Sequence, residues 1–339
     1  MSPSTTPSAD RIEQVAFGFM ASKVLFSAIE FGLFTELAKG PLDAGEIQRR
    51  LGVHPRSAHD FLDALVALGM LGREADLYMN TPETAFYLDR SKPTYIGSFF
   101  EMFNMRDFPF WGSLSEALTT GKPQNEVKGG GGDLFAALSL NPERLRLFVR
   151  SMTGHSLPSA MAIAQKFPWV KYKTFVDIGT AEGCLPAQVA LANPHLVGAG
   201  FDLPMVRPLF EEYVASFGLR ERVSFHSGDF FKDSLPTADV LVMGMILHDW
   251  NLEQKRILLR KAYEALPNCG SLIVYEHFID DDRRKNVAGL LMSLMMLIET
   301  QDGFDYTGAD CCGWMREAGF SETRVEQLTS VESMVVGVK

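Results

Sequence analysis

Apolar positions near the start of the chain recur at the spacing of an α-helix. Residues 11–39 carry this pattern, and a Gly-Pro pair then ends it. The apolar residues that would share one face of this helix are Phe17, Met20, Val24, Leu25, Ala28 and Phe31. Shorter helices are expected over 44–51 and 55–71, followed by a wing strand at 78–80. This order of helices, turn and wing predicts a helical winged-helix domain within residues 1–105.

A winged helix can bind DNA, but the polar positions of the candidate recognition helix at 55–71 are poorly suited to it. Asp60 and Asp63 stand there against a single permanent base, Arg56. The chain also has a formal net charge of −10 at pH 7, which opposes contact with a polyphosphate backbone. We therefore expect a dimerisation module here, and no nucleic-acid partner.

Residues 106–165 are predicted to be a helical linker that lines a substrate pocket. The stretch from 95 to 165 is rich in aromatic and Met side chains, which make adaptable apolar walls. Most of these side chains will belong to the core. Phe103 and Trp111 are candidates for the wall that faces a small acceptor molecule.

Residues 166–339 alternate between short apolar strands and helical patterns. The expected strands that alternate with helices are 174–178, 196–201, 223–226, 240–243 and 271–275. This alternation predicts parallel βαβ units in an α/β, Rossmann-like, doubly wound sheet. Four residues join the last two strands, 323–328 and 333–338, and so short a connection makes an antiparallel hairpin.

Composition narrows the class of protein further. Apolar residues make up 46% of the chain and charged residues 22%, as in ordinary globular proteins. The four cysteines include no C-x-x-C pair, so neither a disulfide framework nor a zinc site is expected. The first ten residues lack the order of a signal peptide, and the apolar run at 287–298 is too short to span a bilayer. These features favour a cytoplasmic protein without a membrane partner.

The turn after the first strand of the C-terminal half is the first candidate binding element. Asp177, Gly179 and Gly183 lie in a strand-to-helix turn where small residues let a ligand approach the backbone. The dinucleotide pattern G-x-G-x-x-G fails here, because Ala181 and Cys184 stand at its third and sixth positions. An acid just before the turn suits a cationic amino group, as in the methionine part of S-adenosylmethionine (SAM), although a purely structural tight turn would look the same.

Two more acids follow the next two strands. Asp202, at the tip of the second strand, can accept hydrogen bonds from both hydroxyls of a ribose. Asp229 can accept one from an adenine amine while Phe230 packs on the ring. Either acid could instead cap its own loop. Three acids at successive strand ends, around the crevice where such sheets bind ligands, favour SAM as the cofactor.

His248 follows the fourth strand and is the candidate general base. A lone histidine among apolar residues is more often part of a core, but this one stands at the ligand-binding edge of the sheet. Imidazole accepts a proton near neutral pH, which assists methyl transfer to a hydroxyl. Glu276, at the end of the fifth strand, and Asp305 are the candidate acids that orient it; a solvated loop position is the alternative for Glu276.

The chain resembles the plant-type small-molecule O-methyltransferase family over nearly its whole length. The family includes the caffeate and acetylserotonin O-methyltransferases and bacterial antibiotic-tailoring relatives. The motifs that carry the resemblance are the turn at 177–183, Phe-Asp-Leu-Pro at 201–204, Gly-Asp-Phe-Phe at 228–231 and, most specifically, Leu-His-Asp-Trp at 247–250.

The resemblance implies a SAM-dependent homodimer whose N-terminal helices interlock. It implies Asp202 on the ribose, Asp229 on the adenine and His248 as base, flanked by Glu276 and Asp305. It further implies that Met152 lines the acceptor pocket and that Ser156 approaches the cofactor. One departure is Gly244, where plant members often carry a Lys that contacts the cofactor.

Four functions compete at this point. The preferred one is O-methylation of a phenolic or other hydroxylated metabolite, and the second is methylation of sulfur, nitrogen or carbon by the same fold. A nicotinamide dehydrogenase is disfavoured by the missing glycine pattern. A winged-helix regulator is disfavoured by the acidic helix and by the complete catalytic half.

Overall fold

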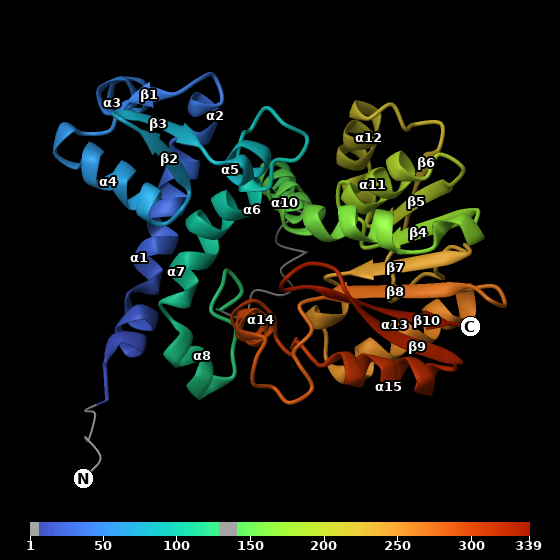
Figure 1. Cartoon of the computed structure of the whole chain (residues 1–339). Helices are drawn as coiled ribbons and strands as arrows, with labels where there is room; N and C mark the ends of the chain where they lie inside the picture. The colour runs from blue at the N-terminus through green and yellow to red at the C-terminus, as the bar shows by residue number, and fades with distance from the viewer. Residues whose placement is uncertain (1–6, 129–140) are drawn as a thin grey trace, which may run out of the picture. The chain divides into compact units, whose positions relative to one another are not determined.

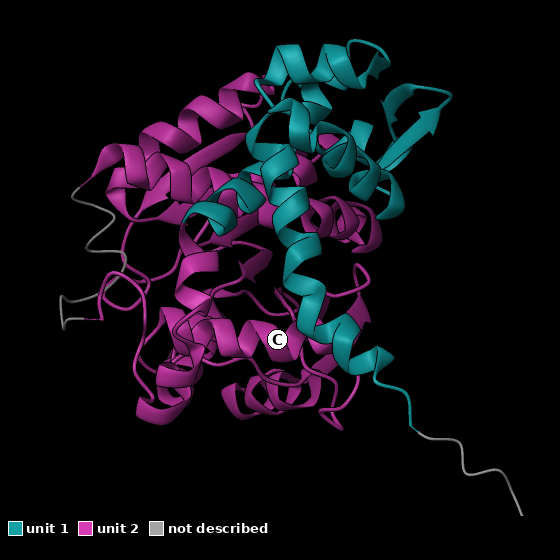
Figure 2. Ribbon diagram, turned by 90° about the vertical axis from the view of Figure 1, so that its left-hand side faces the viewer, with its two compact units in different colours: residues 1–105 teal, residues 106–339 magenta. Residues whose placement is uncertain are grey.

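The chain forms two compact units, Met1–Met105 and Arg106–Lys339, coloured separately in Figure 2. The computed structural model describes residues 7–128 and 141–339, so Gly129–Gly132 of the glycine-rich stretch lie outside the described residues. Each unit is described by itself below.

The first unit surrounds a small antiparallel sheet with short helices (Figure 1). Its helices are α1 (Asp10–Glu30), α2 (Leu33–Leu37), α3 (Ala44–Leu51), α4 (Pro55–Ala67), α5 (Pro82–Tyr87) and α6 (Gly97–Met102). Its strands are β1 (Leu42–Asp43), β2 (Leu71–Glu74) and β3 (Leu77–Asn80), in the order β1-β3-β2. Hairpin β2–β3 is the predicted wing.

Two helix predictions in this unit were too long. The helix expected over 11–39 is broken at Gly32, whose φ of +71° ends α1 and starts α2. Arg90 reaches this break and donates from Nη2 to the carbonyl oxygen of Ile29 at 2.8 Å. The helix expected over 55–71 ends at Ala67, because Gly69 turns the chain with a φ of +73° and Leu71 begins β2.

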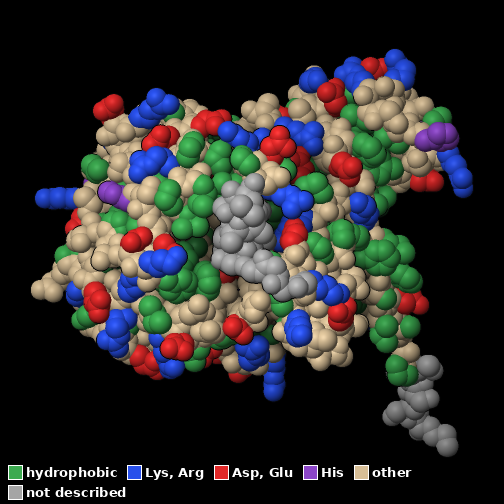
Figure 3. Space-filling model, turned by 180° about the vertical axis from the view of Figure 1, so that it is seen from behind, with side chains coloured by type: hydrophobic (Ala, Val, Ile, Leu, Met, Phe, Trp, Pro, Cys, Tyr) green, Lys and Arg blue, Asp and Glu red, His purple; other side chains and the backbone are tan. Residues whose placement is uncertain are grey.

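The predicted apolar face of α1 is buried only in its C-terminal half. Ala28 and Ile29 pack in the core of the unit with Leu33, Phe34 and Leu62. Farther along α1 toward the N-terminus large apolar side chains are exposed: Ile12 is 74% exposed, Val15 77%, Phe17 56%, Phe19 55% and Met20 51%. Figure 3 shows hydrophobic side chains along this end of the helix. By length and composition alone, α1 also qualifies as a membrane-spanning helix, with 17% of its apolar window buried.

The second unit is built on a seven-stranded, mostly parallel sheet. Its strands are β4 (Thr174–Ile178), β5 (Val197–Asp202), β6 (Val223–Ser227), β7 (Val240–Gly244), β8 (Ser271–Glu276), β9 (Glu322–Gln327) and β10 (Ser333–Val338). The order is β6-β5-β4-β7-β8-β10-β9, and only the β8–β10 and β10–β9 pairs are antiparallel. The Rossmann-like sheet and its terminal hairpin are confirmed.

Helices cover this sheet and extend from it. They are α7 (Phe108–Trp111), α8 (Leu114–Thr120), α10 (Pro142–Lys166), α11 (Cys184–Ala192), α12 (Arg207–Ser216), α13 (Leu252–Ala265), α14 (Val287–Glu299) and α15 (Gly308–Ala318). Helices α13 and α15 share a core with alternate residues of β7, Leu241 and Met243. Helices α11 and α12 pack with β6 in a second core. The predicted buried helix at 287–298 is α14, but its first turns are open, with Val287 62% exposed.

The strand order places a topological switch point between β4 and β7. The chain leaves β4 toward β5 and β6, then crosses back to β7 and β8 on the other side. In open α/β sheets the crevice at the carboxyl ends of such strands is where ligands bind. Asp177 lies near the end of β4, and the loop after β7 carries His248, so the candidate residues belong to this edge.

Candidate functional site

The turn after β4 has the backbone geometry of a ligand cradle. Gly179 and Gly183 adopt φ values of +74° and +94°, which side chains rarely allow. A Cβ atom on Gly183 would lie 2.7 Å from the ring of Phe210, so α12 packs directly on this turn. A Cβ atom on Gly179 would overlap the side chain of Ile246. The turn therefore touches the same loop that carries His248.

Two carboxyl groups border this turn, one buried on Asp177 and one half-buried on Asp202. Asp177 is 5% exposed, and burial raises its pKa to about 7. Asp202 accepts hydrogen bonds from the backbone N–H of Ala181 at 2.9 Å and of Leu203 at 2.7 Å, one on each oxygen. Burial raises the pKa of Asp202 to about 6 despite these bonds. Asp202 thus fixes the turn, and each oxygen keeps a lone pair for a ligand.

The turn and its acids fit SAM by their chemistry. A ligand with a cationic end and ribose hydroxyls supplies charge and hydrogen-bond donors to Asp177 and Asp202, which burial has deprived of water. The two glycines allow the left-handed backbone of the turn, while Ile246 and Phe210 pack against them.

Asp229 and Phe230 both contact neighbouring groups of the protein. Asp229 accepts a hydrogen bond from the N–H of Phe231 at 2.9 Å and pairs with Lys232 at 2.8 Å. Burial is the largest single effect on its pKa and raises it, but these contacts together outweigh burial and lower the pKa. Asp229 therefore caps its own turn, which was the alternative interpretation. The Phe230 ring packs edge-on against Trp250, with centroids 5.9 Å apart.

His248 is buried among three carboxyl groups. It lies in a 3-10 turn (Leu247–Asp249) directly after β7. Its Nδ1 is 3.3 Å from Oδ1 of Asp305, and its Nε2 is 3.6 Å from Oδ1 of Asp249. Glu276, which has no exposed surface, accepts a hydrogen bond from the backbone N–H of His248 at 3.0 Å. The structure therefore brings the three predicted catalytic residues together, and Glu276 is not a solvated loop acid.

The carboxyl groups determine the protonation of His248. Burial alone would lower the pKa of this imidazole, but the charges of Asp249, Asp305 and Glu276 outweigh it and raise the pKa to about 10. The carboxyl groups therefore stabilise the imidazolium that forms when His248 accepts a proton.

Lys255 ties together the two loops that form this cluster. Its side chain is fully buried in α13, and Nζ donates to the carbonyl oxygens of Trp250 and Phe304. The ammonium group also lies 3.4 Å from the centroid of the Phe304 ring. Trp250 closely follows His248, and Phe304 directly precedes Asp305. Lys255 therefore fixes the two loops whose side chains form the contact between the imidazole and the Asp305 carboxylate.

Tyr275 occupies the space beside Gly244. A Cβ atom on Gly244 would overlap the phenol ring of Tyr275, so no side chain fits at this position. Ser156 of α10 hydrogen-bonds to the same phenol, while burial raises the pKa of Tyr275 well above its usual value. A side chain at position 244, such as the Lys that plant members often carry, would therefore require Tyr275 to move, and Ser156 contacts this tyrosine.

The three predicted substrate residues lie in different parts of the chain. Met152 is half-buried on α10, one turn before Ser156, and Trp111 on α7 donates to Sδ of Met295 at 3.2 Å. Phe103 belongs to the first unit, where its ring lies 6.0 Å from that of Phe26. Met152 and Trp111 share the unit of His248.

Sequence reasoning missed four residues of this neighbourhood. They are Asp249, Lys255, Tyr275 and Glu299. Asp249 could have been found from its place beside His248. Glu299, at the end of α14, is 7% exposed and pairs with Arg106 at 2.6 Å.

The sheet order, the acids at its edge and the buried histidine define a SAM-dependent methyltransferase. The family model described as the O-methyltransferase domain matches residues 111–321, and the model of the O-methyltransferase dimerisation domain matches residues 13–90. The chain therefore belongs to the O-methyltransferase family, and the resemblance seen in the sequence is confirmed.

Individual relatives span nearly the whole chain. It is 42% identical over 335 residues to the tetracenomycin polyketide synthesis 8-O-methyl transferase TcmO of Streptomyces glaucescens, covering 97% of this chain and 96% of that protein. It is 35% identical to the N,N-dimethyltransferase OxyT of Streptomyces rimosus, covering 96% and 95%. The crystal structure of human N-acetylserotonin methyltransferase in complex with SAM has a TM-score of 0.88 at 27% identity, covering 100% of this chain and 99% of that one.

Proposed function

We propose that this enzyme methylates a phenolic hydroxyl of a fused-ring aromatic metabolite, with His248 as the general base. The observation that carries the proposal is the burial of His248 among Asp249, Glu276 and Asp305 at the edge of the cofactor turn. The printed name of the relative at 42% identity, an 8-O-methyl transferase of polyketide synthesis, supports the class of acceptor.

The proton affinity of His248 matches that of a phenol. Its pKa is raised to about 10, and a phenol such as a Tyr side chain has an unperturbed pKa of about 10. A raised pKa makes the imidazole a stronger proton acceptor for such a hydroxyl. In the productive state the phenolate faces an imidazolium, and Asp305 on the Nδ1 side stabilises that cation. Glu276 fixes the backbone of His248 and so sets the direction of its ring.

The cofactor residues have complementary roles in this proposal. SAM, when bound, supplies an electrophilic methyl group on a sulfonium. Asp177 attracts the cationic amino group, and Asp202 accepts from the ribose hydroxyls. Gly179 and Gly183 admit the ligand to the backbone. Ser156 approaches the cofactor together with Tyr275.

The adenine and the acceptor are assigned to further residues. We assign Phe230 to the adenine ring and Asp229 to the adenine amine. Oδ1 of Asp229 accepts from Phe231 and Oδ2 pairs with Lys232, and each oxygen has a further lone pair for the amine. Met152 and Trp111, on α10 and α7 of the second unit, are assigned to the acceptor wall. The assignment of Phe103 rests on the sequence alone.

Nitrogen is the alternative methyl acceptor. The relative at 35% identity is named an N,N-dimethyltransferase, and it covers the chain almost as fully. An amine is a nucleophile only when neutral, so a buried base near it would also be useful.

The proposed oligomeric state and cellular location rest on the family match and on the side chains at the surface of the chain. We propose a homodimer through the N-terminal unit, because that unit matches a dimerisation domain and leaves the start of α1 apolar and exposed. We also propose a cytoplasmic enzyme without a nucleic-acid or membrane partner. The net charge of −10 supports this, and on the face seen in Figure 3 basic and acidic side chains are interspersed.

An isotope experiment distinguishes the two acceptor atoms. The purified enzyme is incubated with SAM carrying a 13C-labelled methyl group and with pairs of polycyclic aromatics that differ only in a hydroxyl or an amino group. We expect the label on oxygen, identified by the 13C chemical shift of the product. Transfer to the amino member alone would favour the nitrogen alternative, and transfer to neither would refute the aromatic acceptor.

A further inference from the structure

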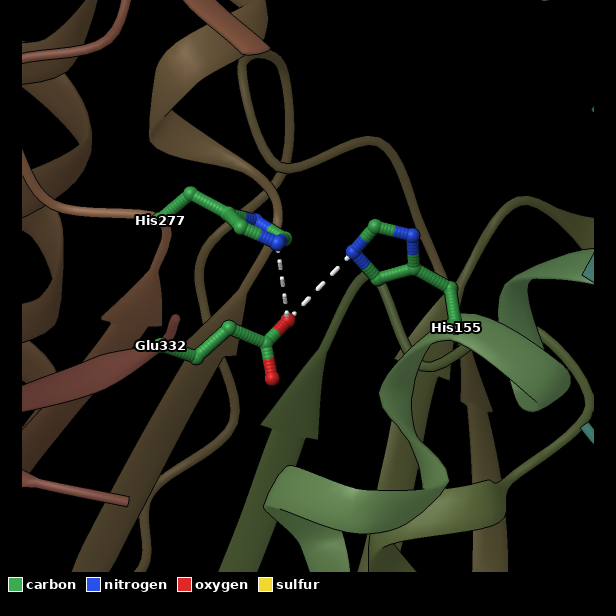
Figure 4. A group of neighbouring side chains, drawn as sticks. All are labelled: His155, His277 and Glu332. Carbon is green, nitrogen blue, oxygen red and sulfur yellow. Dashed lines mark ion pairs between the residues drawn. The ribbon is translucent and has the colours of Figure 1, made fainter. Parts of the chain in front are cut away.

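A second buried histidine cluster lies in the catalytic unit, apart from the groups around His248. His155 projects from α10, His277 directly follows β8, and Glu332 lies in the turn between β9 and β10 (Figure 4). One ligand atom of each residue lies within 4.8 Å of the others. Their side chains are 9%, 9% and 4% exposed. Three distant parts of the sequence thus converge on one small volume.

We propose that His155, His277 and Glu332 bind one divalent transition-metal ion of the zinc class. Two imidazoles and one carboxylate are the donor set of many such sites, which keep a further position for water. The sequence offered no sign of this site, because the cysteines contribute nothing to it and the three residues have no characteristic spacing.

The distances fit coordination better than direct pairing. Oε1 of Glu332 lies 3.4 Å from Nε2 of His155 and 3.7 Å from Nε2 of His277. A charge-assisted hydrogen bond would bring such atoms to about 2.8 Å. A tetrahedral ion with bonds of about 2.1 Å holds its ligand atoms about 3.4 Å apart. The carboxylate oxygen and both ring nitrogens point toward a common centre in Figure 4.

A further contact orients the carboxylate. Ser159, one turn after His155 on α10, donates a hydrogen bond to Oε2 of Glu332. Oε1 is therefore directed at the two histidines. In metal sites, such outer hydrogen bonds normally orient the ligands. A bound ion would tie α10 to the end of β8 and to the β9–β10 turn, and would stabilise the fold of this unit.

Metal titration of the untagged, chelator-treated enzyme tests the site. We use a Cys269→Ser background, because Cys269 is an exposed thiol that could bind metal adventitiously. The parent protein should bind one Zn²⁺ per chain by calorimetry, gain thermal stability, and give the visible absorption of four-coordinate Co²⁺. His277→Gln and Glu332→Gln should each weaken Zn²⁺ binding at least about tenfold. His226→Gln, which removes an exposed histidine, is the matched control and should bind as the parent does.

Two outcomes would overturn the site. One is a parent protein that binds no stoichiometric Zn²⁺, in which case the three residues form only a buried ion pair. The other is a His277→Gln variant that folds, by its circular dichroism, and binds Zn²⁺ as tightly as the parent. If Glu332→Gln fails to fold, His277→Gln decides the question alone.

Discussion

At the scale of single residues, the chemistry depends on the charge around one imidazole. His248 has Asp305 on its Nδ1 side and Asp249 on its Nε2 side, while Glu276 holds its backbone N–H. Together these acids keep the imidazolium stable to about pH 10. An imidazole with so high a pKa is suited to accept the proton of a substrate whose own pKa lies in the same range.

Removing one of these acids should shift the titration of His248. Asp305→Asn keeps the size of the side chain and removes a negative charge 3.3 Å from Nδ1. The pKa of His248 should therefore fall below about 10, and activity should rise at lower pH than in the parent, with a maximal rate reduced about tenfold. NMR titration of the His248 ring, together with the pH profile of kcat, measures both effects.

Asp302→Asn is the matched control, because this acid lies in the same loop but is exposed. It should leave the His248 titration where it is. An Asp305→Asn variant with an unchanged His248 pKa would show that Asp305 does not act on the imidazole.

The affinity for SAM should depend on pH through Asp177 and Asp202. Their pKa values are raised to about 7 and about 6, mainly by burial, so both groups lose their charge as the pH falls through this range. A protonated acid attracts a cation less and accepts fewer hydrogen bonds, so SAM should bind at least about tenfold more weakly at about pH 5 than at about pH 8. Calorimetry at a series of pH values measures this.

Asp202→Asn should weaken SAM binding at about pH 8 by about 1–3 kcal/mol and flatten its pH dependence. Asp282→Asn, at an exposed position, should do neither. Affinity that is independent of pH in the parent enzyme would argue against both assignments.

At the scale of elements, the shape of the turn after β4 depends on Gly183, and Gly218, which follows α12, is a matched glycine for comparison. Gly183 and Gly218 both have a positive φ, at +94° and +68°. Only at Gly183 would a Cβ atom meet a neighbour, the Phe210 ring at 2.7 Å, while Gly218 has open space. Gly218→Ala should therefore lower the free energy of unfolding by about 1 kcal/mol from backbone strain, and Gly183→Ala by about 3 kcal/mol.

Urea denaturation of the two alanine variants measures this difference. Equal losses would mean that α12 does not restrain the turn, and that the packing of Phe210 on Gly183 is not a determinant of its position.

Most elements were predictable from the sequence because their signals are local. Most strands described in the second unit come from short apolar runs, whereas β9 reads Glu-Thr-Arg-Val-Glu-Gln and follows from the five-residue connection that pairs it with β10. The break at Gly32 was not predictable, since the apolar pattern runs through it and Arg90 stabilises it from a distant part of the chain.

The candidate site was predictable only in part, for the same reason. Motifs identify His248 and the acids at strand ends, because those positions follow from the order of the elements. The ring of Tyr275 beside Gly244, the capping role of Asp229 and the convergence of His155 with Glu332 all depend on side-chain packing across elements. No spacing along the chain encodes such contacts.

At the scale of the whole molecule, the start of α1 presents apolar side chains that a single chain does not bury. Replacing Val15 and Phe19 with Asp introduces charge on two apolar side chains that are 77% and 55% exposed. If a second chain covers this helix, the parent should have the mass of two chains and the double variant that of one. Size-exclusion chromatography with light scattering measures the mass.

Val170→Asp is the control for added surface charge, since Val170 is 82% exposed in the other unit. It should remain dimeric. A monomeric parent would contradict the proposed assembly, and a parent that floats with lipid vesicles would show that a membrane covers α1 instead.

The central claim is that His248 serves the chemical step while other residues bind the cofactor. The most direct measurement compares the parent with His248→Gln in two assays, SAM titration and single-turnover methyl transfer at saturating SAM. We expect the SAM dissociation constant to stay within about twofold, because Asp177 and Asp202 remain, and the transfer rate to fall at least about tenfold. Methyl transfer at the parental rate near neutral pH would contradict the account.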